Sequence, residues 1–209
     1  VALALTAIGK DPTQVGGYNL LAPLGDYEQT IWQGINGAAF ALLALDSADY
    51  AVPTAPTGKT QASREMYVDC LLQAELENGG WALSGTEADA DLTAMVLQAL
   101  AKYTEDSQVK AAVERGLTAL SAQQNADGSF STGDVATCES TAQVVVALGE
   151  LGISLSDSRF VKNENDVLDG LLPFALSDGS FCHQQGGKAD TMATEQAFYA
   201  LVAADRLAK

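Results

Sequence analysis

The chain has few cationic side chains: 11 Lys and Arg stand against 27 Asp and Glu, a formal net charge of −16 over 209 residues. This balance repels nucleic-acid phosphates and anionic lipid surfaces, so we expect no nucleic-acid partner. The longest uninterrupted apolar run is Ala38–Leu45. Because a bilayer-spanning helix needs roughly 18 such residues or more, the sequence predicts no membrane span.

Cysteine and histidine are also scarce. The three cysteines, Cys70, Cys138 and Cys182, are odd in number and form no CxxC pair, which excludes a disulfide framework. We expect them to behave as small buried apolar side chains. With His183 as the single histidine, a zinc site is poorly supplied with ligands, and His183 is predicted to be a polar loop residue. No metal and no cofactor are expected.

Apolar residues make up 47% of the chain and charged residues 18%, which is typical of a packed globular domain. The first residues, VALALTAIG, contain neither an initiating Met nor a basic region. We therefore expect one domain over residues 1–209 that is processed or belongs to a longer protein with other domains.

A repeat of about 50 residues is the main pattern in the chain. Four similar segments occur: NGAAFALLAL from Asn36, TAMVLQALAK from Thr93, TAQVVVALGE from Thr141 and TEQAFYALVA from Thr194. A glycine followed closely by an aromatic residue precedes the last three of them, at Gly80-Trp81, Gly128-Ser129-Phe130 and Gly179-Ser180-Phe181. These turns are expected to bend the chain tightly while the ring wedges between neighbouring repeats.

Each repeat is predicted to be a helical hairpin. Residues 66–76, 109–120 and 160–176 show amphipathic helical spacing, whereas the last three similar segments, from Thr93, Thr141 and Thr194, are apolar nearly all round, as in helices buried on both sides. We see no strand with convincing alternation. The expected fold is all-α: stacked hairpins of inner and outer helices that form a partial or complete α/α toroid.

The segment Gln73–Trp81, QAELENGGW, matches the QW motif of squalene and oxidosqualene cyclases. A degenerate copy runs from Arg115-Gly116 through Gln123 and Gln124 to DGSF at Phe130, and a third copy around Phe181 has lost its glutamine. The chain resembles domains of the prenyltransferase and squalene-oxidase repeat superfamily in secreted and surface proteins of Gram-positive bacteria. This resemblance implies an α/α toroid and an extracellular or cell-surface location, but no particular activity.

The catalytic motifs of this superfamily are incomplete here. In the position of the cyclase DxDD motif, whose acid protonates an alkene, stands Asp89-Ala90-Asp91-Leu92, so the motif is not intact and Leu92 replaces its last Asp. We expect Asp89 and Asp91 to cap the helix that follows, as capping residues also stand before the next inner helices at Thr137/Glu139 and Asp190/Thr191. Asp69 and Cys70 are adjacent, not spaced as in the prenyltransferase zinc site, and no thioester motif is present.

We therefore expect a non-catalytic binding or structural module of an extracellular bacterial protein, which binds a small-molecule or surface ligand at the inner-helix N-termini. The candidate ligand-binding residues are Trp32, Asn36, Trp81, Asp89, Asp91, Phe130, Glu139, Phe181 and His183. A simpler interpretation is that these residues serve only as turn wedges and helix caps. Two other functions stay open: a terpene-cyclase-like or prenyl-handling enzyme with Asp89 or Asp91 as acid, and a cobalamin-carrier-like binding domain.

Overall fold

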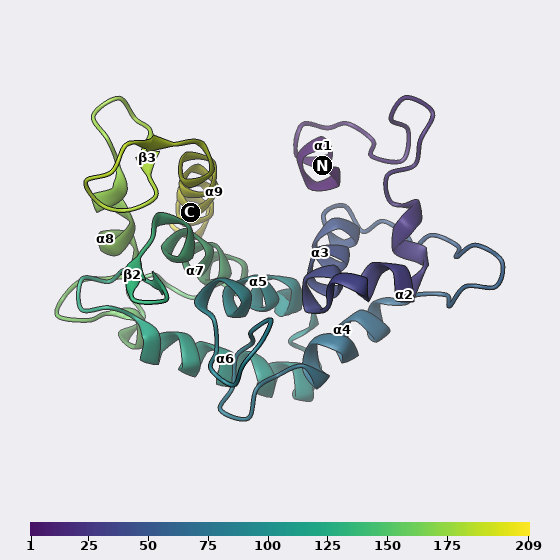
Figure 1. The fold of residues 1–209 in the computed structure, drawn as a ribbon, viewed down its shortest axis with the longest axis horizontal. Helices are drawn as coiled ribbons and strands as arrows, with labels where there is room; N and C mark the ends of the chain where they lie inside the picture. Colours follow the sequence, from purple (N-terminus) through teal and green to yellow (C-terminus); the bar gives the residue numbers. More distant parts are fainter. The chain divides into compact units, whose positions relative to one another are not determined.

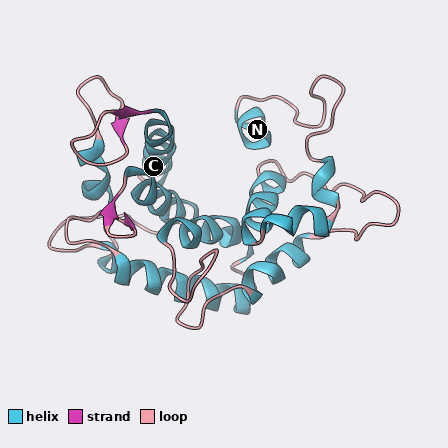
Figure 2. Cartoon of the chain, viewed as in Figure 1, coloured by secondary structure: helices cyan, strands magenta, loops and turns pink.

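The computed structural model describes all residues, 1–209, and is 53% helical with nine α-helices and only short strands. The mostly α prediction is thereby confirmed (Figures 1 and 2). The helices are α1 (Ala2–Ala7), α2 (Tyr27–Thr30), α3 (Ile35–Asp46), α4 (Arg64–Gln73), α5 (Ala90–Leu100), α6 (Ser107–Gln123), α7 (Cys138–Glu150), α8 (Val167–Leu171) and α9 (Thr191–Leu207). The strands are β1 (Ser131–Thr132), β2 (Val135–Ala136), β3 (Phe181–Cys182) and β4 (Ala189–Asp190).

The chain divides into two compact units, an N-terminal unit of residues Val1–Glu75 and a C-terminal unit of residues Leu76–Lys209. Each unit is described by itself below. The expectation of one domain over residues 1–209 stays a prediction.

In the N-terminal unit, α3 packs against α4. Leu42 and Leu45 of α3 and Leu71 of α4 are fully buried. Burial of each of these side chains stabilises the folded state by about 2 kcal/mol. Arg64 at the start of α4 donates to the Asp46 carboxylate over 2.7 Å and to the Tyr50 carbonyl over 2.8 Å. This pair of contacts fixes the end of α3 to the beginning of α4.

In the C-terminal unit, α5, α7 and α9 are inner helices that lie side by side, with α7 in the middle (Figure 1). Helices α5 and α7 run in the same direction, because Asp91 and Gln98 of α5 contact Ser140 and Gln143 of α7 in that order. Helix α9 runs the same way, because Cys138 at the start of α7 contacts Ala193 and Gly149 near its end approaches Ala203. Buried residues cover α5 and α7 nearly all round, as predicted. In α9, by contrast, only an alanine face is buried, so the prediction of burial on all sides is wrong there.

Amide side chains link the three inner helices in series. Gln98 of α5 donates to the Gln143 side-chain oxygen of α7 over 2.9 Å, and Gln143 in turn donates to the Gln196 side-chain oxygen of α9 over 3.0 Å. Gln98 is buried, so these bonds satisfy polar groups that would otherwise be costly inside an apolar stack.

The outer layer contains one long helix and one short one. Helix α6 packs against α5 and includes the whole segment 109–120 that was predicted to be amphipathic. The predicted helix over 160–176 is wrong: only α8 and two short 3-10 turns form there. Asn163 and Glu164 adopt left-handed φ angles of 48° and 71°, which interrupt a right-handed helix.

The three Gly-aromatic turns share one hydrogen-bond pattern. In the second turn, the Gly128 N–H donates to the Asn125 carbonyl over 3.0 Å, and the Asn125 N–H donates to the Ser129 carbonyl over 2.9 Å. The turns that begin at Leu76 and Leu176 repeat both bonds. The glycine at the fourth position has a φ between 84° and 88° in all three copies, a conformation that favours glycine.

A threonine of each inner helix clamps the aromatic residue of its turn. The Oγ1 atoms of Thr93, Thr141 and Thr194 accept hydrogen bonds of 2.9, 3.0 and 2.9 Å from the backbone N–H groups of Trp81, Phe130 and Phe181. The rings themselves are buried, with 0%, 0% and 4% of their surfaces exposed. The predicted wedge role of these aromatic residues agrees with this burial.

Two short β-hairpins, which the sequence analysis did not anticipate, follow the second and third turns. Strand β1 pairs with β2, and β3 pairs with β4, each over two residues only (Figure 2). The aromatic residue pairs with the residue that caps the next inner helix, as in the Thr137 N–H to Phe130 carbonyl bond and the Phe181–Asp190 pair. Two-residue strands are too short to show a period of two in the sequence.

Candidate functional site: the start of the inner helices

The inner helices of the C-terminal unit begin with side-chain caps. The Asp89 carboxylate accepts from the Leu92 N–H over 2.8 Å, Thr137 Oγ1 from the Ser140 N–H over 3.3 Å, and the Asp190 carboxylate from the Ala193 N–H over 2.9 Å. These bonds satisfy backbone donors that have no partner inside the helix. Capping by these three residues is therefore confirmed.

Asp91 does not cap its helix. It is the second residue of α5, and its Oδ2 atom accepts hydrogen bonds from Ser140 Oγ over 3.2 Å and from Thr132 Oγ1 over 3.4 Å. Its other oxygen, Oδ1, is buried and has no hydrogen-bond partner. Burial, and secondarily the charge of Asp89, raises the pKa of the Asp91 carboxyl, although the two hydroxyl donors act in the opposite direction.

Glu139 occupies the equivalent position in α7 and contacts His183. Its carboxylate lies 2.8 Å from His183 Nδ1, with 12% of the Glu139 side chain and 52% of the His183 side chain exposed. When His183 is protonated, this contact is an ion pair, and when it is neutral, it is a hydrogen bond through the Nδ1–H tautomer.

The contacts of Asp91 and Glu139 are two copies of one arrangement. Thr132 and His183 each stand two residues after the aromatic residue of a turn, Phe130 and Phe181. In both copies, the carboxylate at the second helical position reaches the side chain at this point of the next repeat. The site residues therefore tie successive repeats together.

The other predicted candidates are placed differently. The rings of Trp81, Phe130 and Phe181 belong to the core: a Cβ added to Gly116 of α6 would lie 2.9 Å from the Trp81 ring, so α6 approaches that ring closely. Trp32 and Asn36 lie in the N-terminal unit, where Trp32 is 79% exposed and the Asn36 side-chain oxygen is buried without a partner.

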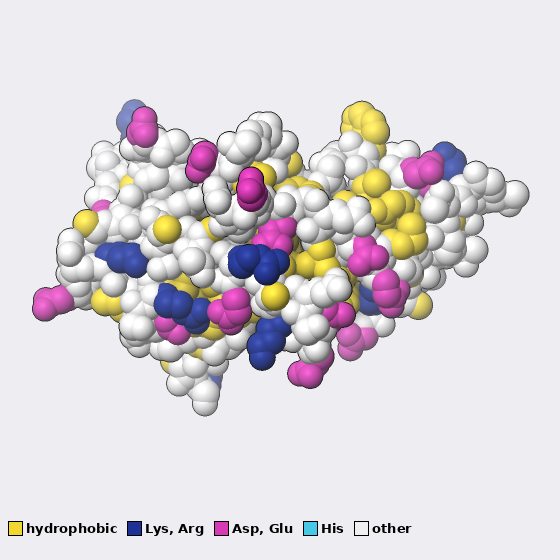
Figure 3. All heavy atoms as spheres, turned by 90° about the horizontal axis from the view of Figure 1, so that it is seen from below, with side chains coloured by type: hydrophobic (Ala, Val, Ile, Leu, Met, Phe, Trp, Pro, Cys, Tyr) yellow, Lys and Arg dark blue, Asp and Glu magenta, His cyan; other side chains and the backbone are white.

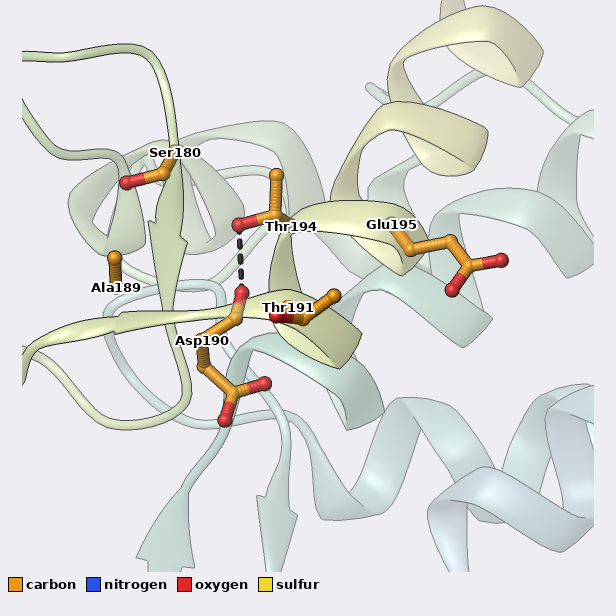
Figure 4. A pocket seen from close by; sticks show the side chains of 6 residues that line it. All are labelled: Ser180, Ala189, Asp190, Thr191, Thr194 and Glu195. Carbon is orange, nitrogen blue, oxygen red and sulfur yellow. Dashed lines mark hydrogen bonds between the residues drawn. The ribbon is translucent and has the colours of Figure 1, made fainter.

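A surface hollow of about 370 Å³ lies at the start of α9 (Figure 4). It is lined by Ser180, Ala189, Asp190, Thr191, Thr194 and Glu195. Thr194 Oγ1 donates to the Asp190 carbonyl over 2.6 Å within it, and the Glu195 side chain extends away from the Asp190 carboxylate (Figure 4). Asp89 and Asp91 do not line this hollow.

A second hollow, of about 460 Å³, belongs to the N-terminal unit. Its lining is apolar and comes from the chain start, α3 and the segment between α1 and α2: Val1, Ala2, Leu3, Leu20, Leu21, Leu24, Phe40 and Ala44. None of the predicted site residues lines it.

The cysteines are free thiols, and Cys138 and Cys182 are buried as expected, whereas Cys70 is only partly buried, so the expectation is wrong for it. Burial, followed by the charge of Glu139, raises the pKa of the Cys138 thiol to about 12. Burial also raises the pKa of the Cys70 thiol. A thiol with a raised pKa is a weak nucleophile and a weak metal ligand. No group of three or more His, Cys, Asp or Glu side chains is arranged so that it could hold a metal ion.

Sequence analysis missed Ser140 and Thr132 as partners of Asp91. Both residues occupy defined positions of the repeat. Ser140 is the third residue of an inner helix, and Thr132 follows the turn aromatic by two residues. A pattern of this kind becomes visible only when the contact between repeats is known.

No protein-family model matches the chain, and no curated protein is similar enough to count as a match. No helix is both long and apolar enough to cross a membrane. On the face shown in Figure 3, Lys and Arg side chains are few, and several of them lie beside Asp or Glu side chains.

Proposed function

We propose that the chain is a non-catalytic binding or structural module of an extracellular bacterial protein, built as a partial or complete α/α toroid of the prenyltransferase and squalene-oxidase repeat type. One observation carries the proposal. The acidic side chains at the inner-helix starts, Asp91 and Glu139, are engaged with Ser140 and His183 of the following repeat. They link neighbouring hairpins through hydrogen bonds.

The aromatic residues support the same function. A cyclase lines its cavity with aromatic faces that stabilise carbocations. Here the rings of Trp81, Phe130 and Phe181 are buried, and Gly116 of α6 approaches the Trp81 ring closely. Their surfaces are used for packing, which favours a scaffold over a cyclase.

The toroid and the superfamily membership rest on the repeat geometry of the C-terminal unit. Parallel inner helices with outer helices behind them are what a hairpin stack of this type requires. Gln124, from the degenerate second copy of the QW motif, donates to the Gly128 carbonyl over 3.1 Å and to the Phe160 carbonyl over 2.9 Å. The glutamine thus holds its own turn, a structural use of the motif.

A double-mutant cycle tests whether the contact of Asp91 with Ser140 links the two repeats. The effects of Asp91→Ala and Ser140→Ala on the free energy of unfolding are expected to be non-additive by about 0.5–3 kcal/mol, because both substitutions remove one shared interaction. Asp106, the exposed N-cap of α6, supplies the control, since Asp106→Ala and Ser140→Ala are expected to be additive. Additive effects for the Asp91 pair would contradict the proposal.

A second candidate function is an enzyme that uses Asp91 as an acid, and one observation favours it: burial raises the pKa of this carboxyl. The proposed module is expected to leave squalene, oxidosqualene and prenyl diphosphates unchanged when the products are analysed by mass spectrometry. Conversion that is lost in Asp91→Asn would establish the enzyme and overturn the module. A spectral response on titration with cobalamin would instead favour the carrier.

A further inference from the structure

The first Gly-aromatic turn differs from the other two at the residue before its glycine. This residue is Asp127 in the second turn and Asp178 in the third, but Asn78 in the first. The Asp127 carboxylate accepts from the Ser129 N–H over 3.1 Å and from the Ser129 hydroxyl over 2.6 Å. Asp178 repeats both bonds with Ser180, over 3.0 and 2.6 Å. Each carboxylate thus closes an Asx turn onto the backbone two residues on.

The first turn lacks these bonds. Gly80 stands at the serine position and has no hydroxyl, and a Cβ atom there would meet Ala88 at 2.8 Å and the Thr93 hydroxyl oxygen at 2.9 Å. The Asn78 side chain is exposed and makes no hydrogen bond. Its amide carbon is therefore free to turn towards the backbone nitrogen of Gly79, which no side chain obstructs.

We propose that Asn78 is a site of spontaneous deamidation, which the folded chain converts to aspartate. The Gly79 N–H first leaves the Leu76 carbonyl, to which it donates over 2.8 Å. Base removes its proton, the nitrogen bonds to Cγ of Asn78, and the Nδ2 group takes up a proton and leaves as ammonia. The resulting five-membered imide adds water. Cleavage at Cγ gives aspartate, whereas cleavage at the backbone carbonyl carbon gives isoaspartate.

The surroundings of the turn favour aspartate over isoaspartate. Gly79 is buried, and a Cβ atom on it would lie 2.8 Å from the Arg115 carbonyl oxygen of α6. Isoaspartate adds one carbon to the backbone directly before this contact and close to the Trp81 N–H that Thr93 binds. Aspartate leaves the backbone unchanged, and its carboxylate can accept from the Gly80 N–H, as in the other two turns. The modified chain thereby gains the residue that those turns encode.

The second Asn-Gly pair, Asn36-Gly37, provides an internal comparison. It lies in the first turn of α3, and the Asn36 side-chain oxygen is buried. A Cβ atom on Gly37 would meet the Thr30 carbonyl oxygen at 1.9 Å, so the backbone has no room to rearrange. Imide formation at Asn36 requires the start of α3 to open. We therefore expect Asn36 to remain an amide in the native protein.

Intact-mass measurement and peptide mapping test the proposal on native protein stored in warm, mildly alkaline buffer. Conversion of one amide to an acid raises the mass by about 1 Da. The gain is expected at Asn78, at least about tenfold faster than at Asn36, because only the latter reaction needs a helix to open. Electron-transfer fragmentation distinguishes the two products and should find mostly aspartate. Asn78→Gln is the matched control, since glutamine forms the larger imide slowly and should abolish the gain.

A native protein whose mass stays constant overturns the proposal, because the turn would then protect the amide. Equal rates at Asn36 and Asn78 overturn it as well. An isoaspartate majority in the native protein overturns the preference for aspartate. Asn78→Asp, which carries the product from the start, should match or exceed the wild type in urea midpoint. A lower midpoint would show that the turn does not accept the carboxylate.

Discussion

Thr141 Oγ1 accepts a hydrogen bond from the Phe130 N–H over 3.0 Å and donates one to the Thr137 carbonyl over 2.9 Å. The threonine and the phenylalanine are both fully buried. This single hydroxyl therefore joins a turn to the first turn of an inner helix in a place that water does not reach.

Replacing Thr141 by valine keeps the side-chain shape but leaves the Phe130 N–H without a partner. An unsatisfied buried polar group costs about 1–3 kcal/mol, so Thr141→Val is expected to lower the free energy of unfolding by that amount in a denaturant titration. Thr141→Ser retains the hydroxyl and should recover part of the loss. Thr118→Val on the exposed side of α6 serves as the control, and an equal effect at both positions would contradict the clamp.

Gly128 and Gly179 occupy the same position in two turns, with φ angles of 87° and 88°. A Cβ atom on Gly128 would meet the Asp166 carbonyl oxygen at 2.0 Å, whereas one on Gly179 would meet nothing within 4 Å. Gly179→Ala should cost about 1–2 kcal/mol for the left-handed backbone alone. Gly128→Ala should cost at least about 2 kcal/mol more. Equal losses of stability for the two variants in denaturant titrations would show that a Cβ atom at Gly128 can be accommodated as easily as one at Gly179.

The buried carboxyl of Asp91 predicts a pH dependence. Its raised pKa means that the folded state holds this proton more tightly than the unfolded state, so ionised Asp91 reduces stability at neutral pH. As the pH falls from 7 through the raised pKa, this cost disappears in the wild type. The stability difference between wild type and Asp91→Asn should therefore shift in favour of the wild type.

Urea titrations of both proteins between about pH 7 and pH 4 measure this shift. Because the two proteins share all other carboxyl groups, the general effect of lowering the net negative charge cancels in the comparison. A constant difference for Asp91→Asn would mean that the carboxyl titrates alike in the folded and unfolded states.

The thiols predict a chemical outcome. Since the pKa of Cys138 is raised to about 12 and Cys182 is buried, these two thiols of the native protein should react slowly with a thiol reagent at pH 8. Three thiols should react promptly after unfolding in denaturant. Reaction of fewer than three thiols in the unfolded protein would reveal a disulfide, and rapid reaction of Cys138 in the native state would show that its surroundings open.

The sequence predicted the inner helices and the Gly-aromatic turns because both repeat their chemistry at fixed spacing. In the first repeat, the sequence alignment is wrong by two residues. It places Asn36 at the position of Thr93, whereas the buried positions of α3 and α5 coincide when Ala38 is placed there. This repeat has no threonine clamp, and its inner helix is an Ala- and Leu-rich run. Such a run can be aligned with the other repeats in several registers with similar scores.

The region between α7 and α8 shows a different limit. Apolar spacing suggested one helix over 160–176, but the pairing of Lys162 with Asn165 forms a tight loop there. The loop is held by contacts between residues that are distant in the sequence, such as the bond that the Asn165 side chain donates to the Ala126 carbonyl. The contacts of Asp91 with the next repeat were unpredictable for the same reason.

The chain of amides from Gln98 through Gln143 to Gln196 has a direction: each glutamine donates to the next one. Sliding α7 by a single turn, about 5.4 Å, would move the Gln143 amide out of reach of both neighbouring glutamines. An apolar stack of alanine, valine and leucine tolerates such slippage, but a buried amide without a partner does not. The three glutamines thus fix the axial register of three helices whose remaining contacts are apolar and not specific for one register.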